Sequence, residues 1–227
     1  MDAGGATDAD DGGRVVSTAS LAIDRSAATE RRELDSSSWL DVTRAFVREP
    51  GALLDQLVTE APWHESTVWR YEKHLVEPRL GAQLPMEQLP AAIRQAHLHL
   101  ESRYRVRFDT PVLVRYRNGR DSVAPHRDRE MRWLEDTVIA IAVLGEPRPF
   151  VIRPLGGDRE PSAADIDVRP GNGDLLVMGG RFQNAWLHGV PKVPHATERV
   201  SVTWRWTSRR GAPDRSPSYS APRNFSS

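Results

Sequence analysis

The sequence predicts an α+β protein whose C-terminal two-thirds is a jelly roll of two β-sheets with helices packed outside it. Two observations support this fold class. Residues 86–104 have apolar side chains at helical spacing, with Pro90 where a first-turn residue would stand. Beyond residue 110 the pattern changes to short β-branched runs divided by Gly, Pro, Asn and Asp. Helices therefore precede strands, and the strands are short and numerous, as in a β-sandwich or barrel.

The folded body is predicted to span residues 39–207. Aromatic residues are absent before Trp39 and scarce after Thr207. Residues 1–38 combine small polar residues with scattered charge, and they hold too few large apolar groups to offset the entropy of ordering the chain. We expect residues 1–38 and the Pro/Ser/Arg-rich tail 208–227 to be disordered, on either side of one domain.

The composition excludes several classes of protein. Basic and acidic residues balance at 31 each, so no global excess of charge indicates a nucleic-acid or membrane binder. The absence of cysteine excludes disulfide scaffolds, cysteine-bound metals and thiol nucleophiles. No signal peptide is recognisable, and no run approaches the ~20 apolar residues of a membrane span. We expect a soluble, monomeric, cytoplasmic protein.

The first part of the body contains the predicted helices. Residues 39–57 begin with a short apolar stretch, break at Pro-Gly and continue with helical spacing, which predicts a strand or turn followed by a helix. Residues 63–80 alternate only partly, which favours strands or an irregular lid. The helix predicted in 86–104 has an apolar stripe formed by Leu89, Ile93, Ala96, Leu98 and Leu100.

The strands of the jelly roll follow this helix. Each run is seven to nine residues of mainly β-branched or apolar character, bounded by residues typical of turns. The runs occupy 111–117, 137–145, 149–155, 165–171, 174–180 and 199–207.

The segment VRYRNGRDSVAPHRDRE, residues 114–130, is the most informative for chemistry. In an extended strand His126 and Asp128 project from the same face, because one residue separates them. One more histidine would complete the facial triad that binds non-haem Fe(II) and leaves open coordination positions. His188, just after the strand-like DLLVMGG, is the candidate. A His-x-Asp pair alone is a weak signal, since chance surface pairs are common.

Two arginines strengthen this interpretation. Arg199 and Arg205 share one face of the strand 199–207, while Val200, Val202 and Trp204 share the other. Arginines that point into a barrel interior would be costly unless they met anions. A dicarboxylate would supply both partners through bidentate hydrogen bonds.

Together, the motifs YRNGRDSVAPHRDRE, GDLLVMGG, WLHGVPK and RVSVTWR resemble the AlkB-type family of Fe(II)- and 2-oxoglutarate-dependent dioxygenases. The resemblance covers residues 45–206 and is most specific from 114 to 205. It implies a double-stranded β-helix, a cupin-like jelly roll. It also implies a reaction in which O2 and 2-oxoglutarate hydroxylate an N-alkyl carbon of the substrate, releasing an aldehyde, succinate and CO2.

The resemblance also implies roles for individual residues. His126, Asp128 and His188 would hold Fe(II). Arg199 and Tyr116 would bind the distal carboxylate of 2-oxoglutarate, and Arg205 would bind the end that chelates iron. Within this family an acidic residue at the position of Glu130 faces the substrate base. A solvated Glu130 that pairs with neighbouring arginines is the competing interpretation.

Two departures from the family pattern bear on cosubstrate and substrate. Val114 stands where many relatives have asparagine, which removes a contact to 2-oxoglutarate, and Ser201 stands where some relatives have another asparagine. Gln83 and Leu84 stand where relatives that repair DNA often have an aromatic pair. A base-stacking platform is then missing, or is supplied by Trp63, Trp69 or Tyr71, although core or lid packing is the simpler role for these three.

The sequence leaves three functions open. The first is oxidative dealkylation of N-alkylated nucleic-acid bases, of the DNA- or RNA-repair type. Phosphate contacts would then come from a basic run that could equally be an exposed strand face. The second is hydroxylation of a small molecule or protein side chain at the same iron centre, and the third is a non-catalytic scaffold. The basic run comprises Arg103, Arg105, Arg107, Arg115, Arg117 and Arg120.

Overall fold

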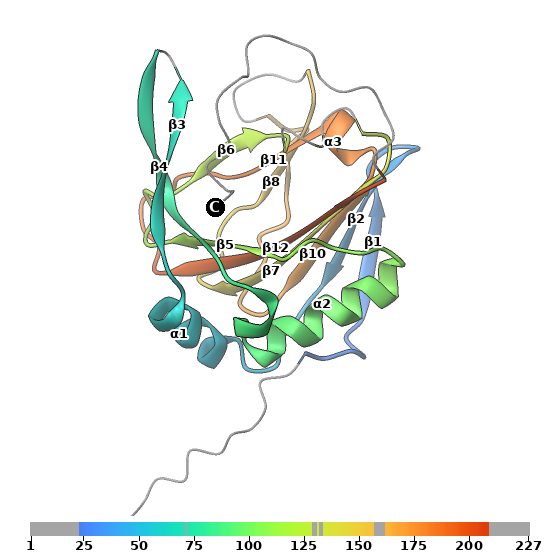
Figure 1. Cartoon of the computed structure of the whole chain (residues 1–227). Helices are drawn as coiled ribbons and strands as arrows, with labels where there is room; N and C mark the ends of the chain where they lie inside the picture. The colour runs from blue at the N-terminus through green and yellow to red at the C-terminus, as the bar shows by residue number, and fades with distance from the viewer. Residues whose placement is uncertain (1–22, 71, 129–130, 132–133, 157–161, 209–227) are drawn as a thin grey trace, which may run out of the picture.

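The computed structural model describes the whole chain except residues 1–22, 71, 129–130, 132–133, 157–161 and 209–227. Its strands form two antiparallel sheets that face each other, and helices cover the outer side of the larger sheet (Figure 1). The predicted α+β jelly roll is confirmed. The elements are β1 (Thr29–Glu33), β2 (Ser38–Thr43), α1 (Pro50–Glu60), β3 (His64–Arg70), β4 (Lys73–Gln83), the 3-10 helix η1 (Met86–Gln88), α2 (Ala91–Tyr104), β5 (Val112–Tyr116), β6 (Val123–His126), β7 (Thr137–Gly145), β8 (Val151–Pro154), β9 (Ile166–Asp167), β10 (Leu175–Gly180), α3 (Phe182–Ala185), β11 (Trp186–Val190) and β12 (Arg199–Thr207).

Strand order explains how distant motifs meet. The larger sheet has the order β1-β2-β10-β7-β12-β5-β4-β3, and the smaller sheet has the order β6-β11-β8-β9. β12 lies between β7 and β5, with Arg199 opposite Tyr116. In the smaller sheet β11 pairs with β6, with His188 opposite His126. The two motif-bearing strand pairs therefore belong to opposite sheets of the jelly roll.

The core has two layers, one on each side of the larger sheet. On β7, Ile139 and Ile141 pack between the two sheets, whereas Ala140 and Ala142 pack toward the helices. The alternation follows from the two-residue period of a strand. Because both faces of β7 are covered, this strand has a continuous run of apolar residues rather than an alternating one.

The predicted disorder of residues 1–38 is wrong for its C-terminal part. Strand β1 pairs with β2 along its whole length. Its side chains are mostly exposed and polar, because it is the edge strand of the sheet, so its composition resembled that of a disordered segment. Arg31 stabilises the strand by a two-point ion pair with Asp41, 2.7 and 2.8 Å, and by lying 4.1 Å above the ring of Trp39. The rest of the expected disorder, in residues 1–22 and 209–227, lies outside the described residues.

The predicted helix 86–104 is divided into η1 and α2, and its apolar stripe contains one error. Leu89, Ile93 and Leu100 are buried, as the stripe requires, but Leu98 is 63% exposed. Residues two positions apart on an α-helix are separated by about 200° around its axis, so Leu98 points away from Leu100 and from the core. Residues 63–80 form the β3–β4 hairpin, which extends beyond the body of the larger sheet (Figure 1). None of the helices in the described ranges is long and apolar enough to cross a membrane.

Candidate active site

Three candidate metal ligands converge at the end of the smaller sheet. Ligand atoms of His126, Asp128 and His188 all lie within 4.8 Å of one another. The imidazole centroids are 4.5 Å apart, and Nε2 of His126 is 3.4 Å from Oδ1 of Asp128. The expected single strand through both His126 and Asp128 is wrong, because β6 ends at His126. Asp128 lies two residues beyond the strand, and its carbonyl accepts a hydrogen bond from the Met131 amide at 3.0 Å.

Gly189 allows the two histidine strands to approach. A Cβ atom at this position would lie 2.8 Å from the Val123 carbonyl oxygen and 2.8 Å from the Pro125 nitrogen, both main-chain atoms of β6. Main chain cannot rotate away as a side-chain end can, so any larger residue would push β11 from β6. The register shift between His188 and Val190 lies at the same point. The backbone at this position therefore sets the distance between His188 and His126.

The protonation states of the triad suit a metal ion. Burial, and then the nearby His126, lower the pKa of His188 to about 3, so its imidazole is neutral. Burial alone would raise the pKa of Asp128, but Arg205 and the two histidines together hold it well below its ordinary value. Nδ1 of His126 lies 3.0 Å from the Ala124 carbonyl, which can only accept, so this nitrogen carries a proton and Nε2 is the nitrogen that faces Asp128. Two imidazoles and one carboxylate are the donor set of a non-haem Fe(II) site.

Arg199 is a buried cation without an anion. It is 0% exposed, and none of its three guanidinium nitrogens has a hydrogen-bond partner within the described part of the chain. Its guanidinium carbon lies 5.7 Å from the ring centroid of Tyr116, which is also buried. Burial lowers the pKa of Arg199 to about 10, so the side chain remains charged at neutral pH. A buried charge in this state favours binding of an anion.

The second strand arginine contacts the metal-ligand cluster directly. Nε of Arg205 donates to Oδ2 of Asp128 at 2.7 Å. The inward face predicted for positions 199 to 205 is therefore the one observed, since Arg199 and Arg205 both reach the space between the sheets. The two departures from the family pattern, Val114 and Ser201, are directly opposite each other in the β5–β12 pairing, two residues along from the Tyr116–Arg199 pair.

Arg148 belongs to the same region and was not identified from the sequence. It is 1% exposed, and it donates to the carbonyl oxygens of Asn118 at 3.2 Å, Asp121 at 2.8 Å and Pro191 at 2.7 Å. Its guanidinium lies 5.5 Å from the Tyr116 ring centroid. It thus ties the loop after Tyr116 to the loop after β11. No side-chain pattern predicts a role that depends on main-chain acceptors.

The predicted substrate residues are only partly covered by the structure. Glu130 and Tyr71 lie outside the described residues, as does the side chain of Trp69. Trp63 has the packing role that was expected, because it is partly buried against the helical core and its Nε1 donates to the Leu57 carbonyl at 3.0 Å.

Half of the basic run is engaged in ion pairs. Arg107 pairs with Glu101 at 2.8 Å, and Arg115 pairs with Glu198. Arg117 pairs with Asp121 through two hydrogen bonds of 2.8 and 3.0 Å. Paired cations offer less net charge to a phosphate than free ones, so the ion pairs weaken the case for phosphate contact by these three. Only Arg115 lies in a strand, and its side chain is 22% exposed, so an exposed strand face does not describe the three either. The remaining members are Arg103, which lies 5.9 Å from the Tyr104 ring centroid, Arg105 and Arg120.

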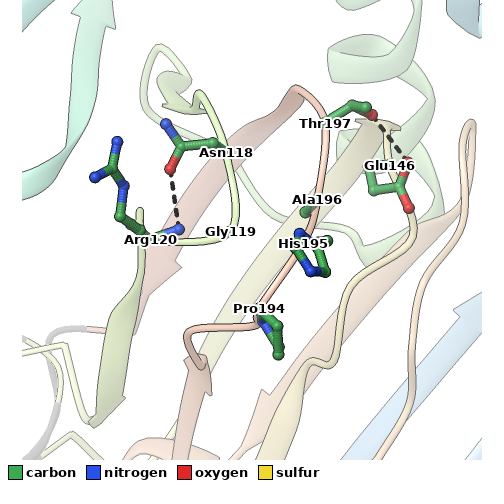
Figure 2. Close-up of a pocket in the computed structure, with 8 residues that line it drawn as sticks. All are labelled: Asn118, Gly119, Arg120, Glu146, Pro194, His195, Ala196 and Thr197. Carbon is green, nitrogen blue, oxygen red and sulfur yellow. Dashed lines mark hydrogen bonds between the residues drawn. The ribbon is translucent and has the colours of Figure 1, made fainter.

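A separate open hollow of about 510 Å³ lies at the loops beyond β5 and β11 (Figure 2). Arg120 and His195 line it, and the Thr197 hydroxyl donates to Glu146 at 2.9 Å beside them. None of the triad residues lines this hollow. His195 is exposed, as expected of a histidine that takes no part in the metal cluster.

Comparisons with known proteins agree with this geometry. Residues 34–209 match the family described as the 2OG-Fe(II) oxygenase superfamily. Human alpha-ketoglutarate-dependent dioxygenase alkB homolog 3 is 31% identical over 187 residues, which cover 74% of this chain and 65% of that protein. DNA oxidative demethylase ALKBH2 of Arabidopsis thaliana is 25% identical over 188 residues, covering 66% of this chain and 60% of that protein. The chain thus spans less than two thirds of the length of these curated relatives.

Solved structures show the same fold at low sequence identity. A prolyl hydroxylase from Trichoplax adhaerens, in complex with a hypoxia inducible factor peptide, aligns with a TM-score of 0.56 at 12% identity and covers 74% of this chain and 83% of its own. OsALKBH1 aligns with a TM-score of 0.52 at 12% identity, covering 77% of this chain and all of its own. On the family match, the curated relatives and the converging triad, the chain belongs to the 2OG-Fe(II) oxygenase superfamily, as a member of the AlkB type.

Proposed function

We propose that the chain is an Fe(II)- and 2-oxoglutarate-dependent dioxygenase that dealkylates N-alkylated nucleic-acid bases. His126, Asp128 and His188 hold the metal in this proposal. Bound Fe(II) supplies the activation of O2 coupled to oxidative decarboxylation of 2-oxoglutarate. The observation that carries the proposal is the pairing of this triad with the unpartnered, buried Arg199. A metal donor set and an anion-binding cation are the two sites that this chemistry requires.

The residues of the chain have separate tasks. Arg199 binds the distal carboxylate of 2-oxoglutarate by charged hydrogen bonds, beside Tyr116. Arg205 keeps Asp128 ionised and fixes the direction of its carboxylate through the 2.7 Å contact. Arg205 also lies close enough to the triad to meet the chelating end of the cosubstrate. Asp128 and His188 are nearly buried, whereas the side chain of His126 is 35% exposed, so the substrate approaches from the His126 side.

The reaction balances without any further reductant. O2, 2-oxoglutarate and an N-methyl base give succinate, CO2, formaldehyde and the unmodified base. One oxygen atom enters succinate and the other enters the methyl carbon, and the N–C bond then breaks as the aldehyde leaves. Support for this substrate class comes from the curated relatives, one of which is named a DNA oxidative demethylase. We assign Glu130 to the base, as the resemblance implies.

Hydroxylation of a small molecule or a protein side chain is the second candidate, and one observation favours it. Arg107, Arg115 and Arg117 are ion-paired, so the basic run lacks much of the free charge that a polyanion would need. The second candidate keeps the same metal and cosubstrate residues. It differs only in what approaches the open side of the triad.

A panel of succinate-release assays tests the proposal. The protein is loaded with Fe(II) and given 2-oxoglutarate together with methylated oligonucleotides, unmodified oligonucleotides or candidate small molecules. Methylation-dependent succinate and formaldehyde are expected. Turnover with small molecules alone would replace the first candidate by the second, and Asp128→Ala serves as the inactive control. A monomeric state and a cytoplasmic location stay predictions.

A further inference from the structure

The short helix α3 holds the main chain of Asp128 through one side chain. Oε1 of Gln183 accepts a hydrogen bond from the Asp128 amide at 2.7 Å. An amide N–H can only donate, so the contact determines which end of the Gln183 side chain faces Asp128. Gln183 is 0% exposed, so water does not compete for this bond.

The rest of α3 contacts residues close to Asp128 along the chain. Nδ2 of Asn184 donates to the Leu134 carbonyl at 3.1 Å, and a guanidinium nitrogen of Arg127 lies 3.5 Å from the Asn184 carbonyl. α3 also leads directly into β11, whose His188 lies three residues beyond the helix. One segment of chain therefore places His188 by its own continuation and Asp128 by a hydrogen bond.

The other end of the Gln183 amide is unfavourable for stability. Nε2 is buried and has no hydrogen-bond partner among the residues that the structure describes. An unsatisfied buried donor costs about 1–3 kcal/mol, so an apolar side chain would suit this position better for stability alone. What Gln183 offers that an apolar residue cannot is the acceptor for Asp128.

We propose that Gln183 is a positioning residue for the metal site. The hydrogen bond from the Asp128 amide fixes the main chain of Asp128. It thereby fixes the direction of the Asp128 side chain and the alignment of its carboxylate with the two imidazoles. Partners of metal ligands act in this way, and their loss typically weakens metal affinity about 10- to 100-fold. The inference rests on the proposed function, because it takes the triad as the metal site.

The test measures binding of Mn(II) alone by titration calorimetry, without cosubstrate and without turnover. Gln183→Met removes the acceptor at similar volume, and we expect the dissociation constant to rise about tenfold. Gln183→Leu removes it with a shorter, branched side chain and should show the same rise, which guards against a folding defect in either variant. Gln183→Glu keeps an acceptor oxygen for the Asp128 amide and adds a negative charge near the ligands, so it should bind Mn(II) at least as tightly as the wild type.

Asn184→Ala is the matched control, because it removes the hydrogen bond from α3 to the Leu134 carbonyl and keeps the one to the Asp128 amide. It should lower the melting temperature while leaving Mn(II) affinity and the absorption spectrum of bound Co(II) unchanged, whereas Gln183→Met should alter that spectrum. Mn(II) affinity of Gln183→Met within about twofold of wild type would overturn the inference. An equal loss of affinity in Asn184→Ala would overturn it as well. If the wild type binds no Mn(II), the proposed function itself fails.

Discussion

Replacing Arg199 with methionine should have opposite effects on stability and on cosubstrate binding. In the free protein Arg199 is a fully buried cation, and its guanidinium has no hydrogen-bond partner in the described ranges. Methionine fills a similar space without a charge. We therefore expect the Arg199→Met protein to be more stable than the wild type in the absence of 2-oxoglutarate, and to bind 2-oxoglutarate poorly.

The magnitudes follow from the burial of this side chain. A pKa of about 10 for Arg199 corresponds to about 3 kcal/mol of unfavourable free energy in the charged folded state. Below pH 10 both the folded and the unfolded states carry the charge, so the full penalty is present at neutral pH. Removing it should stabilise the free protein by about 1–3 kcal/mol, less the contact with Tyr116 that is lost. Losing charged hydrogen bonds to the distal carboxylate costs about 1.5–3 kcal/mol, which is about 10- to 150-fold in affinity.

Thermal unfolding measures both effects in one experiment. With Mn(II) present throughout, the wild type should melt at a lower temperature than Arg199→Met in the absence of cosubstrate. Added 2-oxoglutarate should then raise the melting temperature of the wild type far more than that of Arg199→Met. Arg32→Met is the control for the chemical change, because Arg32 is an exposed edge-strand residue paired with Glu30. An unchanged affinity for 2-oxoglutarate in Arg199→Met would refute the assignment, and a less stable free protein would refute the reasoning about the unpaired charge.

Four further predictions concern the metal and the substrate. Asp128→Ala should abolish Fe(II)-dependent succinate release while the exposed His195→Ala retains it, and substantial turnover by the first variant would disprove the ligand set. Gly189→Ala should lower the free energy of unfolding by about 1–3 kcal/mol and weaken Mn(II) binding, because the new Cβ would lie 2.8 Å from the main chain of β6. Denaturant titration and calorimetry measure the two effects, and unchanged values would mean that the strands adjust freely. Oligonucleotide binding should weaken steeply with salt and be reduced in Arg120→Ala, measured by fluorescence anisotropy, whereas a flat salt dependence would favour the small-molecule candidate. Glu130→Ala should lower dealkylation of a bound methylated oligonucleotide with little change in its affinity, and an equal loss of both would show that the residue does not act on the base.

The features predictable from the sequence are those that depend on strand period and on residue chemistry. The two-residue repeat in β12 placed Arg199 and Arg205 on the inner face, and the structure has them there. His126 and His188 were predicted to share one metal site because two imidazoles and a carboxylate suit Fe(II). The register of β6 and β11 brings the two histidines together. Both inferences needed only the local chain and the chemistry of a ligand.

The features that sequence reasoning missed depend on main-chain partners far along the chain. Arg148 bonds carbonyls in two loops, and Gln183 accepts from an amide 55 residues away, so neither leaves a pattern of side chains to recognise. Strand β1 was missed because an edge strand with exposed residues has the composition of a solvated segment. Its ion pair between Arg31 and Asp41 could be suspected only once the pairing of β1 with β2 was known.

The distribution of unsatisfied polar atoms is an independent argument for the location of the site. Nine buried side-chain nitrogen or oxygen atoms lack a hydrogen-bond partner in the part of the chain that the structure describes, and six of them belong to Arg148, Gln183, His188 and Arg199. Buried polar groups are satisfied almost everywhere in folded proteins, so a cluster of exceptions marks a place where stability is not what the residues provide. The four residues contact the triad, its main chain or Tyr116, and none lies in the helical layer. A dicarboxylate is the partner that would satisfy the three guanidinium nitrogens of Arg199, while Arg148 and Gln183 hold the segments that surround the triad.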